Sequence, residues 1–251
     1  MKVRELHCWD VSPAEARRIQ EELRARVELK DRLTERQGEK RSRSVGTKSK
    51  KRLDAVRLVA GADVAFEFRG RGTSQGRALA GVIVYSFPKL QEIERACAER
   101  PLEFPYVPGL LSFRELPALL AAVAKLRAEP EVIFCDAQGY AHPRRFGLAC
   151  HLGVLLDRAT VGCAKSRLIG EHRQPGRAAG SWAALKDAGE TIGAVLRTRA
   201  DVKPIYVSAG HRVALPSAIA LVLAVCDGYR IPKPTREADH FVEQLKRQGK
   251  S

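Results

Sequence analysis

Three stretches of the chain show the apolar patterns of β-strands. Residues 56–68, VRLVAGADVAFEF, and residues 78–87, ALAGVIVYSF, are rich in small and branched apolar side chains and are joined by a glycine-rich segment. This pattern predicts the two strands of a hairpin. Residues 131–136, EVIFCD, form a short apolar run that ends in an acid. Such a run is typical of a buried central strand.

Helical patterns surround these strands. Ser12, Pro13 and Glu15 supply an N-cap, a first-turn proline and a capping acid, and a sparse apolar stripe continues to Leu33, which predicts a helix over residues 12–33. Residues 89–100 fit either a strand or a helix. We expect further helices over 114–128, 145–156 and 215–227, and strands over 159–163 and 204–210. Hairpin strands followed by alternating strands and helices indicate an α/β fold, with a central mixed β-sheet flanked by helices.

The charge of the chain is strongly positive and unevenly distributed. Its 251 residues contain 44 Lys and Arg against 29 Asp and Glu, a net charge of +15. Residues 36–52 alone hold eight basic residues and one acid, a net charge of +7. An excess of this size favours a polyanionic partner, above all nucleic acid.

The segment 34–52 also divides the chain. It contains one apolar residue, Val45, and so cannot bury enough surface to offset the entropy of ordering. We expect a flexible basic insertion there, which acts as a nucleic-acid-binding arm or only as a solvated segment. The remaining units are then an N-terminal helix packed on the core (1–33), an α/β domain (53–242) and a basic C-terminal tail (243–251).

The six cysteines form no C-x-x-C pair and most lie in apolar segments, which predicts reduced, partly buried thiols. No run of about eighteen apolar residues is present, so we expect no membrane span and no membrane partner. The first ten residues, MKVRELHCWD, lack the apolar stretch of a signal peptide. We therefore expect a cytoplasmic protein, and a monomer.

Two acids share one context. Asp63 lies within the first predicted strand, and Asp136 ends the central one. Burial of a carboxylate costs several kcal/mol unless it is paired or binds a metal. Two separate salt bridges would explain both acids. If the strands are neighbours, a shared divalent cation explains them together, and oxygen-only ligands favour magnesium or manganese.

Two further acids have ordinary explanations. Ser112 and Glu115 have the S-x-x-E spacing of a capping box at the start of a helix. A carboxylate in a first helical turn can also reach a metal at the sheet edge. Asp239, in PTREAD, follows a proline-rich turn and could be a simple surface acid.

Basic residues follow the strands. Lys165 ends a short apolar strand, where it would either extend to solvent or stabilise charge on a phosphate. His142 comes six residues after Asp136 and precedes Arg144 and Arg145, a cluster that could hold a phosphate. His211, in SAGHR, has a similar context, and each histidine alone is more often structural.

The segment FPYVPG has an unusual composition. Pro105 and Pro108 bracket Tyr106 and Val107, and Gly109 closes the segment. The prolines fix φ and force extended geometry on the residues before them. The result is a stiff loop that presents an aromatic ring, suited either to packing or to wedging between bases.

Taken together, these residues resemble the endonuclease V family of deoxyinosine-directed repair nucleases. The resemblance runs from about residue 53 to residue 241, and the predicted N-terminal helix matches the usual first helix of the family. Six segments carry it in the same order: AGADVAF, FPYVPGLLSFRELPALL, CDAQGYAHPRRFGLA, TVGCAKSRL, GHRV and GYRIPKPTREAD.

The resemblance implies a ribonuclease H-like fold and magnesium-dependent cleavage, with manganese as a substitute. It also implies hydrolysis of the second phosphodiester bond on the 3′ side of inosine, which leaves 3′-hydroxyl and 5′-phosphate ends. By position, Asp63 and Asp136 match the central metal-binding aspartates of the family, and Glu115 and Asp239 match its further metal-binding acids. His142 and Lys165 match the catalytic histidine and lysine near the phosphates.

The resemblance also implies a nucleic-acid-binding set, in which Tyr106 matches the wedge tyrosine. The remaining members of the set are Pro105, Val107, Pro108, Gly139 and Arg144. One departure concerns the base pocket: the family usually has Gly-x-Gly after the second aspartate, whereas Ala137 and Gln138 precede Gly139 here. A methyl group at Ala137 could hinder close approach of a base.

Three functions remain open. The first is an inosine-specific DNA repair endonuclease, and the second is the same enzyme acting on inosine in single-stranded RNA. The third is a basic nucleic-acid-binding protein whose acids are structural. The set of four acids beside Lys165 argues against the third.

Overall fold

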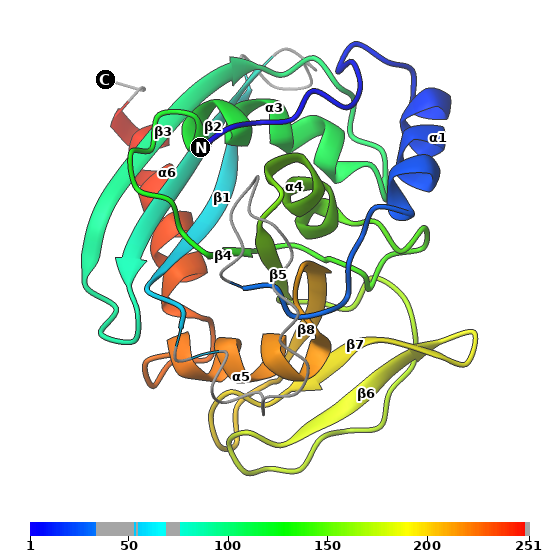
Figure 1. The fold of residues 1–251 in the computed structure, drawn as a ribbon, viewed down its shortest axis with the longest axis vertical. Coiled ribbons are helices and arrows are strands. Elements are labelled where there is room, and N and C mark those ends of the chain that lie inside the picture. The colour runs from blue at the N-terminus through cyan, green and yellow to red at the C-terminus, as the bar shows by residue number, and fades with distance from the viewer. Residues whose placement is uncertain (34–52, 54, 69–75, 249–251) are drawn as a thin grey trace.

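The computed structural model describes residues 1–33, 53, 55–68 and 76–248 (Figure 1). The expected basic insertion, 34–52, and the turn between the first two strands, 69–75, lie outside the described residues. The first helix, α1 (Pro13–Arg24), begins with the predicted capping box, in which Ser12 and Glu15 bond reciprocally. It ends at Arg24 and not at residue 33.

The early end of α1 has a tertiary cause. The segment from Glu28 to Leu33 runs beside the end of the last sheet strand, where the Arg32 amide donates to the Arg212 carbonyl at 2.9 Å. Asp31 accepts hydrogen bonds from the Ala214 amide and the Ser217 hydroxyl, both at 2.8 Å. Leu33 is buried in the core. These contacts outweigh the weak helical stripe beyond Arg24.

One eight-stranded mixed sheet forms the centre of the described part, in the order β3-β2-β1-β4-β5-β8-β7-β6. The first three strands are antiparallel, β4 and β5 run parallel to β1, and the remaining pairs are antiparallel. This arrangement of β1 to β5 is the predicted ribonuclease H-like fold. The strands are β1 (Leu58–Phe68), β2 (Gly76–Ser86), β3 (Glu92–Pro101), β4 (Val132–Cys135), β5 (Ala159–Ala164), β6 (Trp182–Asp187), β7 (Glu190–Leu196) and β8 (Ile205–His211).

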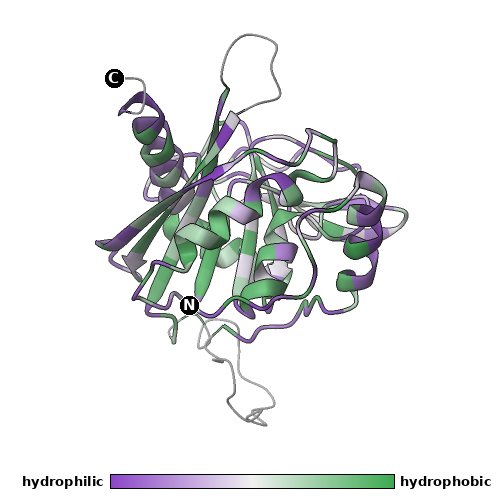
Figure 2. Ribbon diagram, turned by 90° about the horizontal axis from the view of Figure 1, so that it is seen from above, coloured by the Kyte–Doolittle hydropathy of each residue, from purple (hydrophilic) through white to green (hydrophobic). Residues whose placement is uncertain are grey.

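Helices cover both faces of the sheet (Figures 1 and 2). One apolar cluster joins the sheet to α3 (Leu111–Val123) and α4 (Leu148–Leu156). A second cluster on the opposite face includes buried residues of α5 (Leu215–Val225), and Phe241 of α6 (Lys233–Gln248) packs against it. The core therefore lies in two layers, one on each side of the strands.

Several expected elements differ from the structure. Most of residues 89–100 lies in β3 (Glu92–Pro101), which settles the choice between strand and helix. Pairing of Phe68 with Gly76 confirms the hairpin of β1 and β2. The β6–β7 hairpin and α6 were not expected. Because α6 continues to Gln248, residues 243–248 extend this helix and do not form the start of a tail.

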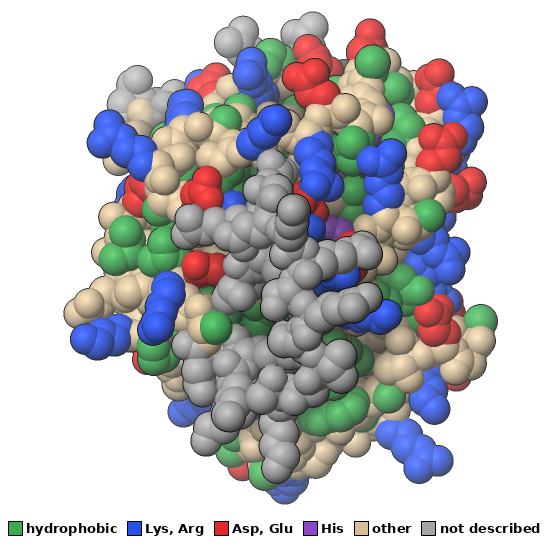
Figure 3. Space-filling model, in the orientation of Figure 1, with side chains coloured by type: hydrophobic (Ala, Val, Ile, Leu, Met, Phe, Trp, Pro, Cys, Tyr) green, Lys and Arg blue, Asp and Glu red, His purple; other side chains and the backbone are tan. Residues whose placement is uncertain are grey.

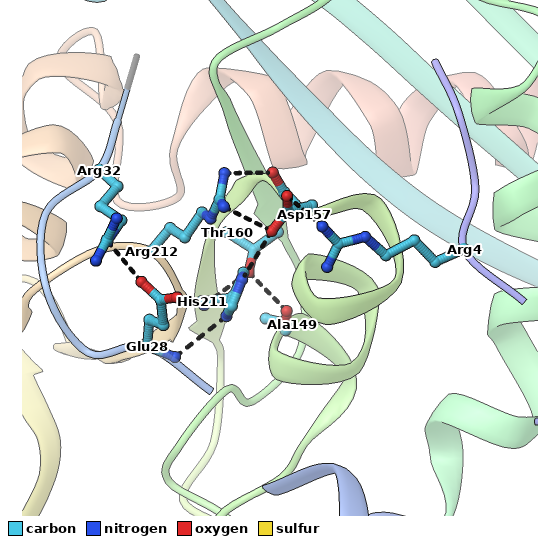
Figure 4. A network of polar contacts seen from close by, with 8 residues as sticks. All are labelled: Arg4, Glu28, Arg32, Ala149, Asp157, Thr160, His211 and Arg212. Atoms are coloured by element: carbon cyan, nitrogen blue, oxygen red, sulfur yellow. Dashed lines mark hydrogen bonds and ion pairs between the residues drawn. The ribbon is translucent and has the colours of Figure 1, made fainter. Parts of the chain in front are cut away.

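A buried ion network ties the N-terminus to the strand edge at which β5 begins (Figure 4). The carboxylate of Asp157 lies 2.5 Å from a guanidinium nitrogen of Arg4 and 2.8 Å from one of Arg212. His211 lies 3.6 Å from the same carboxylate, and its amide donates to the Thr160 hydroxyl. Because Asp157 is buried, the two guanidinium groups offset the desolvation of its charge.

The cysteines are six free thiols, four of them buried. Burial raises the pKa of the Cys135, Cys150 and Cys163 thiols, so that they stay protonated. Among the described residues, no helix is long and apolar enough to cross a membrane.

Candidate active site

The sheet register brings the two strand acids together. In the parallel pair β1 and β4, Ala62 is opposite Cys135, so the next residues are Asp63 and Asp136. Asp63 lies within β1, while Asp136 follows the last residue of β4. The prediction that these acids lie on neighbouring strands is therefore confirmed.

Lys165 and Asp239 complete one side of this edge. Lys165 directly follows β5, the neighbour of β4, and its ammonium lies 2.5 Å from Asp136 Oδ2. The same ammonium lies 3.3 Å from Asp239 Oδ2 on α6. Asp239 is therefore part of the cluster and not an isolated surface acid.

Glu115 reaches the cluster from α3 on the opposite face. The N-cap of α3 is Leu110, with no side-chain cap, so the expected capping box of Ser112 and Glu115 does not form. The Ser112 hydroxyl instead lies 3.1 Å from His151 Nδ1. Burial, followed by repulsion from Asp63 and Asp136, raises the pKa of Glu115 well above its ordinary value.

Negative charge dominates the four-acid cluster, which consists of Asp63, Glu115, Asp136 and Asp239. Burial and the carboxylates of Asp136 and Asp239 raise the pKa of Asp63 to about 7. The Lys165 ammonium pairs with Asp136 and Asp239, and neither Asp63 nor Glu115 forms an ion pair with it in the described part of the chain. An added cation would relieve this repulsion, and a donor set made only of carboxylate oxygens suits a hard divalent ion.

The four carboxyl groups of the cluster do not converge on one point at the distances of a metal site. No group of three or more His, Cys, Asp or Glu side chains in the described part of the chain has the arrangement of a metal centre. The Lys165 ammonium lies between two of the acids. The chemistry of the cluster fits a cation, provided that Lys165 withdraws from one of its partners.

A cavity of about 440 Å³ opens beside this cluster. Its size lies within the usual range of small-molecule sites. Asp136 and Lys165 line it, together with residues of α3, of the FPYVPG loop (Phe104–Gly109) and of the segments that follow β4 and β5. Those that matter below are Gln20, Tyr106, Gly109, Ser112, Gln138, His142 and Ser166.

The FPYVPG loop presents its tyrosine as predicted. Phe104 is buried beneath the loop, whereas Tyr106 is 71% exposed. The Leu110 amide donates to the Val107 carbonyl at 2.9 Å, and Gly109 has a positive φ of 80°. Glycine adopts this conformation without strain, so the loop can turn sharply into α3.

His142 and Arg144 contact this loop and not the acids. His142 Nε2 lies 3.0 Å from the Gly109 carbonyl oxygen, and His142 Nδ1 accepts from the Arg144 amide at 3.2 Å. The Arg144 guanidinium donates to the same carbonyl at 2.7 Å. Both ring nitrogens of a buried neutral histidine are thus used, and a proton-transfer role for His142 stays a prediction.

Arg145 is not available for the phosphate cluster suggested by its neighbours. Its guanidinium is buried and lies 2.8 Å from both Asp187 and Glu190, at the tip of the β6–β7 hairpin. This hairpin was not predicted from the sequence, and so neither were these partners of Arg145. His211 is likewise structural, within the network around Asp157.

Gly139 is buried, so its expected contact with nucleic acid stays a prediction. A methyl group there would lie 2.3 Å from the Ala209 carbonyl oxygen, which shows that close packing on β8 requires glycine. Ala137 and Gln138 line the cavity. Gln138 Nε2 donates to the Ser166 carbonyl at 3.0 Å, a contact that sequence patterns do not reveal.

Acid is expected to destabilise the protein through its buried histidines. Burial lowers the pKa of His7, His142, His151 and His211, to about 4 in His142 and His211. The unfolded chain, with an ordinary value of 6.5, then binds protons first. The contribution of His142 and His211, which are buried, is complete above pH 6.5 and falls toward pH 4, by up to about 1.4 kcal/mol per pH unit for each of the two.

Urea unfolding at pH 7.5, 6.5, 5.5 and 5.0 measures this dependence. His211→Asn should flatten the slope, whereas the same substitution at the exposed His240 should leave it as in the wild type. A free energy of unfolding that stays constant from pH 7 to pH 5 would contradict the assignment of neutral buried histidines.

Comparison with known proteins gives a consistent result. A family profile described as Endonuclease V matches residues 39–240. An endonuclease V from Nostoc sp. is 48% identical over 239 residues, which cover 95% of this chain and 97% of the relative. The crystal structure of endonuclease V from Streptomyces avermitilis has a TM-score of 0.82 and 38% identity, with both chains covered completely.

A structure with bound nucleic acid is also similar. Endonuclease V from Ciona intestinalis, in complex with a 23mer DNA containing an inosine followed by a ribo-adenosine, has a TM-score of 0.74 and 27% identity. The match covers 95% of this chain and 99% of the other.

Proposed function

Because the chain belongs to the endonuclease V family, and so is a nuclease, we propose that it is a magnesium-dependent DNA repair endonuclease for deoxyinosine. It hydrolyses the second phosphodiester bond 3′ to the lesion and leaves 3′-hydroxyl and 5′-phosphate ends. The observation that carries this proposal is the four-acid cluster with Lys165, beside a cavity that Tyr106 also lines.

The acids have a holding role in this proposal. Asp63, Glu115, Asp136 and Asp239 bind Mg²⁺, or Mn²⁺ in its place, through carboxylate oxygens. When bound, the metal polarises the scissile phosphate and activates water. Lys165 releases Asp136 or Asp239 and places its ammonium against the charge that develops on the phosphate.

Tyr106 and the cavity have the recognition role. An extruded hypoxanthine enters the cavity, and the exposed ring of Tyr106 fills the gap that the base leaves in the stack. The inosine-containing DNA bound by the Ciona intestinalis relative supports this assignment. Figure 3 shows Lys and Arg side chains interspersed with acids over this face, and individual Lys and Arg side chains there are available for nonspecific phosphate contacts.

Inosine in single-stranded RNA is the second candidate substrate. The ribo-adenosine that follows the inosine in the Ciona intestinalis complex favours it, because that relative binds a strand with a ribonucleotide on the 3′ side of the inosine. A non-catalytic binding protein would have no use for four clustered carboxyl groups. We also propose that the protein is cytoplasmic and monomeric. Size-exclusion chromatography with light scattering measures its molar mass and so tests the monomeric state.

Cleavage of labelled strands that contain one inosine, as DNA and as RNA, tests the proposal. Each strand is incubated with Mg²⁺, with Mn²⁺ or with EDTA. We expect a single cut, only with metal, at the bond that joins the 3′ neighbour of inosine to the next nucleotide. A metal-dependent cut in RNA alone selects the second candidate. No cut near inosine in either strand would exclude both.

Tyr106→Ala is expected to weaken recognition of the lesion by about tenfold, because a base–aromatic stack contributes about 1–3 kcal/mol. Binding to an undamaged duplex should change by less than about twofold, since it rests on phosphate contacts. Gel-shift titrations of duplexes with and without inosine measure both. Equal losses on the two duplexes would show that Tyr106 is no wedge.

A further inference from the structure

One backbone carbonyl in the wall of the cavity receives three side-chain donors. The Gly109 carbonyl accepts from Arg144 at 2.7 Å, from His142 at 3.0 Å and from Gln20 Nε2 at 3.1 Å. Gly109 ends the FPYVPG loop, three residues after Tyr106. Gln20 lies on α1, far away in the sequence, and no motif marked it as functional.

The amide of Gln20 is used completely. Its Nε2 donates to the Gly109 and Phe146 carbonyls, each at 3.1 Å. Its Oε1 accepts from Arg144 Nε at 2.6 Å. Because both Nε2 partners are carbonyls, which only accept, the orientation of the amide is fixed. The side chain is 1% exposed, so the loss of these bonds would leave buried polar groups without partners.

The apolar face of α1 supports the same loop. Ala16 and Ile19 share one cluster with Phe104 and Val107, which stand on either side of Tyr106. In Figure 1, α1 lies beside the segment that links β3 to α3. Helix α1 therefore supports the FPYVPG loop in two ways: by apolar packing against Phe104 and Val107, and by the hydrogen bond from Gln20 to Gly109.

We propose that Gln20 is a positioning residue for Tyr106. Because Gln20 lies on α1, this helix is then part of the recognition site. This inference rests on the proposed function. A side chain that fills the gap of an extruded base must hold its place against the restacking of that base. Gln20 supplies this stiffness because it locks both the Gly109 carbonyl and the guanidinium of Arg144 that bonds to it.

Gln20→Met tests this role, because Met has a similar length but no hydrogen-bonding amide. We expect single-turnover cleavage of inosine in a duplex to fall about ten- to a hundredfold, since a small misplacement of a recognition group has effects of that size. Cleavage of inosine in a single strand should fall less than about threefold, because an unstacked base needs little extrusion. Glu22→Met, on the exposed side of α1, is the matched control and should match the wild type on both strands.

A second variant guards against a simple loss of folding. Gln20→Glu keeps an acceptor for Arg144 but loses the donor to Gly109, and it should show the same preference for single strands. In a Tyr106→Ala background, neither Gln20 substitution should reduce duplex cleavage further, because the ring that Gln20 positions is already absent. Equal losses on duplex and single strand, or additive losses with Tyr106→Ala, would overturn the inference. Failure of the wild type to cut at inosine would instead reject the proposed function.

Discussion

Asp136→Asn is expected to lower the rate of strand cleavage at least about a thousandfold while strand binding stays within about threefold of the wild type. Asn has the shape of Asp but no charge. The variant loses a carboxylate that would hold the metal and the partner of Lys165 at 2.5 Å. Binding is preserved because the removed charge repels phosphate.

Single-turnover cleavage at saturating enzyme, with a gel-shift titration in parallel, measures the two effects. The matched control is Asp201→Asn, which removes a surface carboxylate paired with Arg177. It should cleave at the wild-type rate. A fully active Asp136→Asn would refute the metal-ligand role, and higher Mg²⁺ should not restore more than a small part of the activity.

Gly61→Ala is expected to destabilise the protein by about 3 kcal/mol and to abolish most of the activity. A Cβ at this position of β1 would lie 1.9 Å from the Pro234 carbonyl oxygen, in the first turn of α6. Both partners are backbone, so neither can turn aside. The helix must move away from the strand, and it carries Asp239 away from Asp63.

Urea unfolding and cleavage assays measure these effects. Gly176→Ala is the control, because the nearest atom to its added methyl is a serine side-chain oxygen at 3.1 Å, which can rotate. It should change the free energy of unfolding by less than about 0.5 kcal/mol. If Gly61→Ala is as stable as the wild type, the close approach of α6 to β1 is wrong.

The parts of the site that are local in sequence could be predicted. Asp63 and Asp136 stand out because a carboxylate in an apolar strand needs an explanation, and strand pairing then places them side by side. The Ser12 capping box was also readable, since both partners lie within one turn. For Glu115, the same spacing rule was misleading, because α3 begins at Leu111 and turns the acid toward the other carboxyl groups.

What could not be predicted depends on partners that are distant in the chain. Gln20 and Gly109 are 89 residues apart, and no periodicity links a helix glutamine to a loop carbonyl. The sequence places Arg145 in a basic cluster suited to phosphate, but its partners Asp187 and Glu190 lie more than forty residues away, on the β6–β7 hairpin. Gly139 belongs to the predicted nucleic-acid-binding set, and its close packing against Ala209 of β8 was not visible in the sequence.

The order of the strands has a consequence for the synthesis of this protein. On a growing chain β1 can pair at once with β2, but β4 comes some seventy residues later and α6 emerges last. Until α6 is released, Pro234 does not pack on Gly61 and Asp239 is absent from the cluster. A nascent chain can thus assemble most of its sheet without a complete cluster of acids. On the proposed role of Asp239, cleavage then depends on the docking of α6 and so begins late in folding.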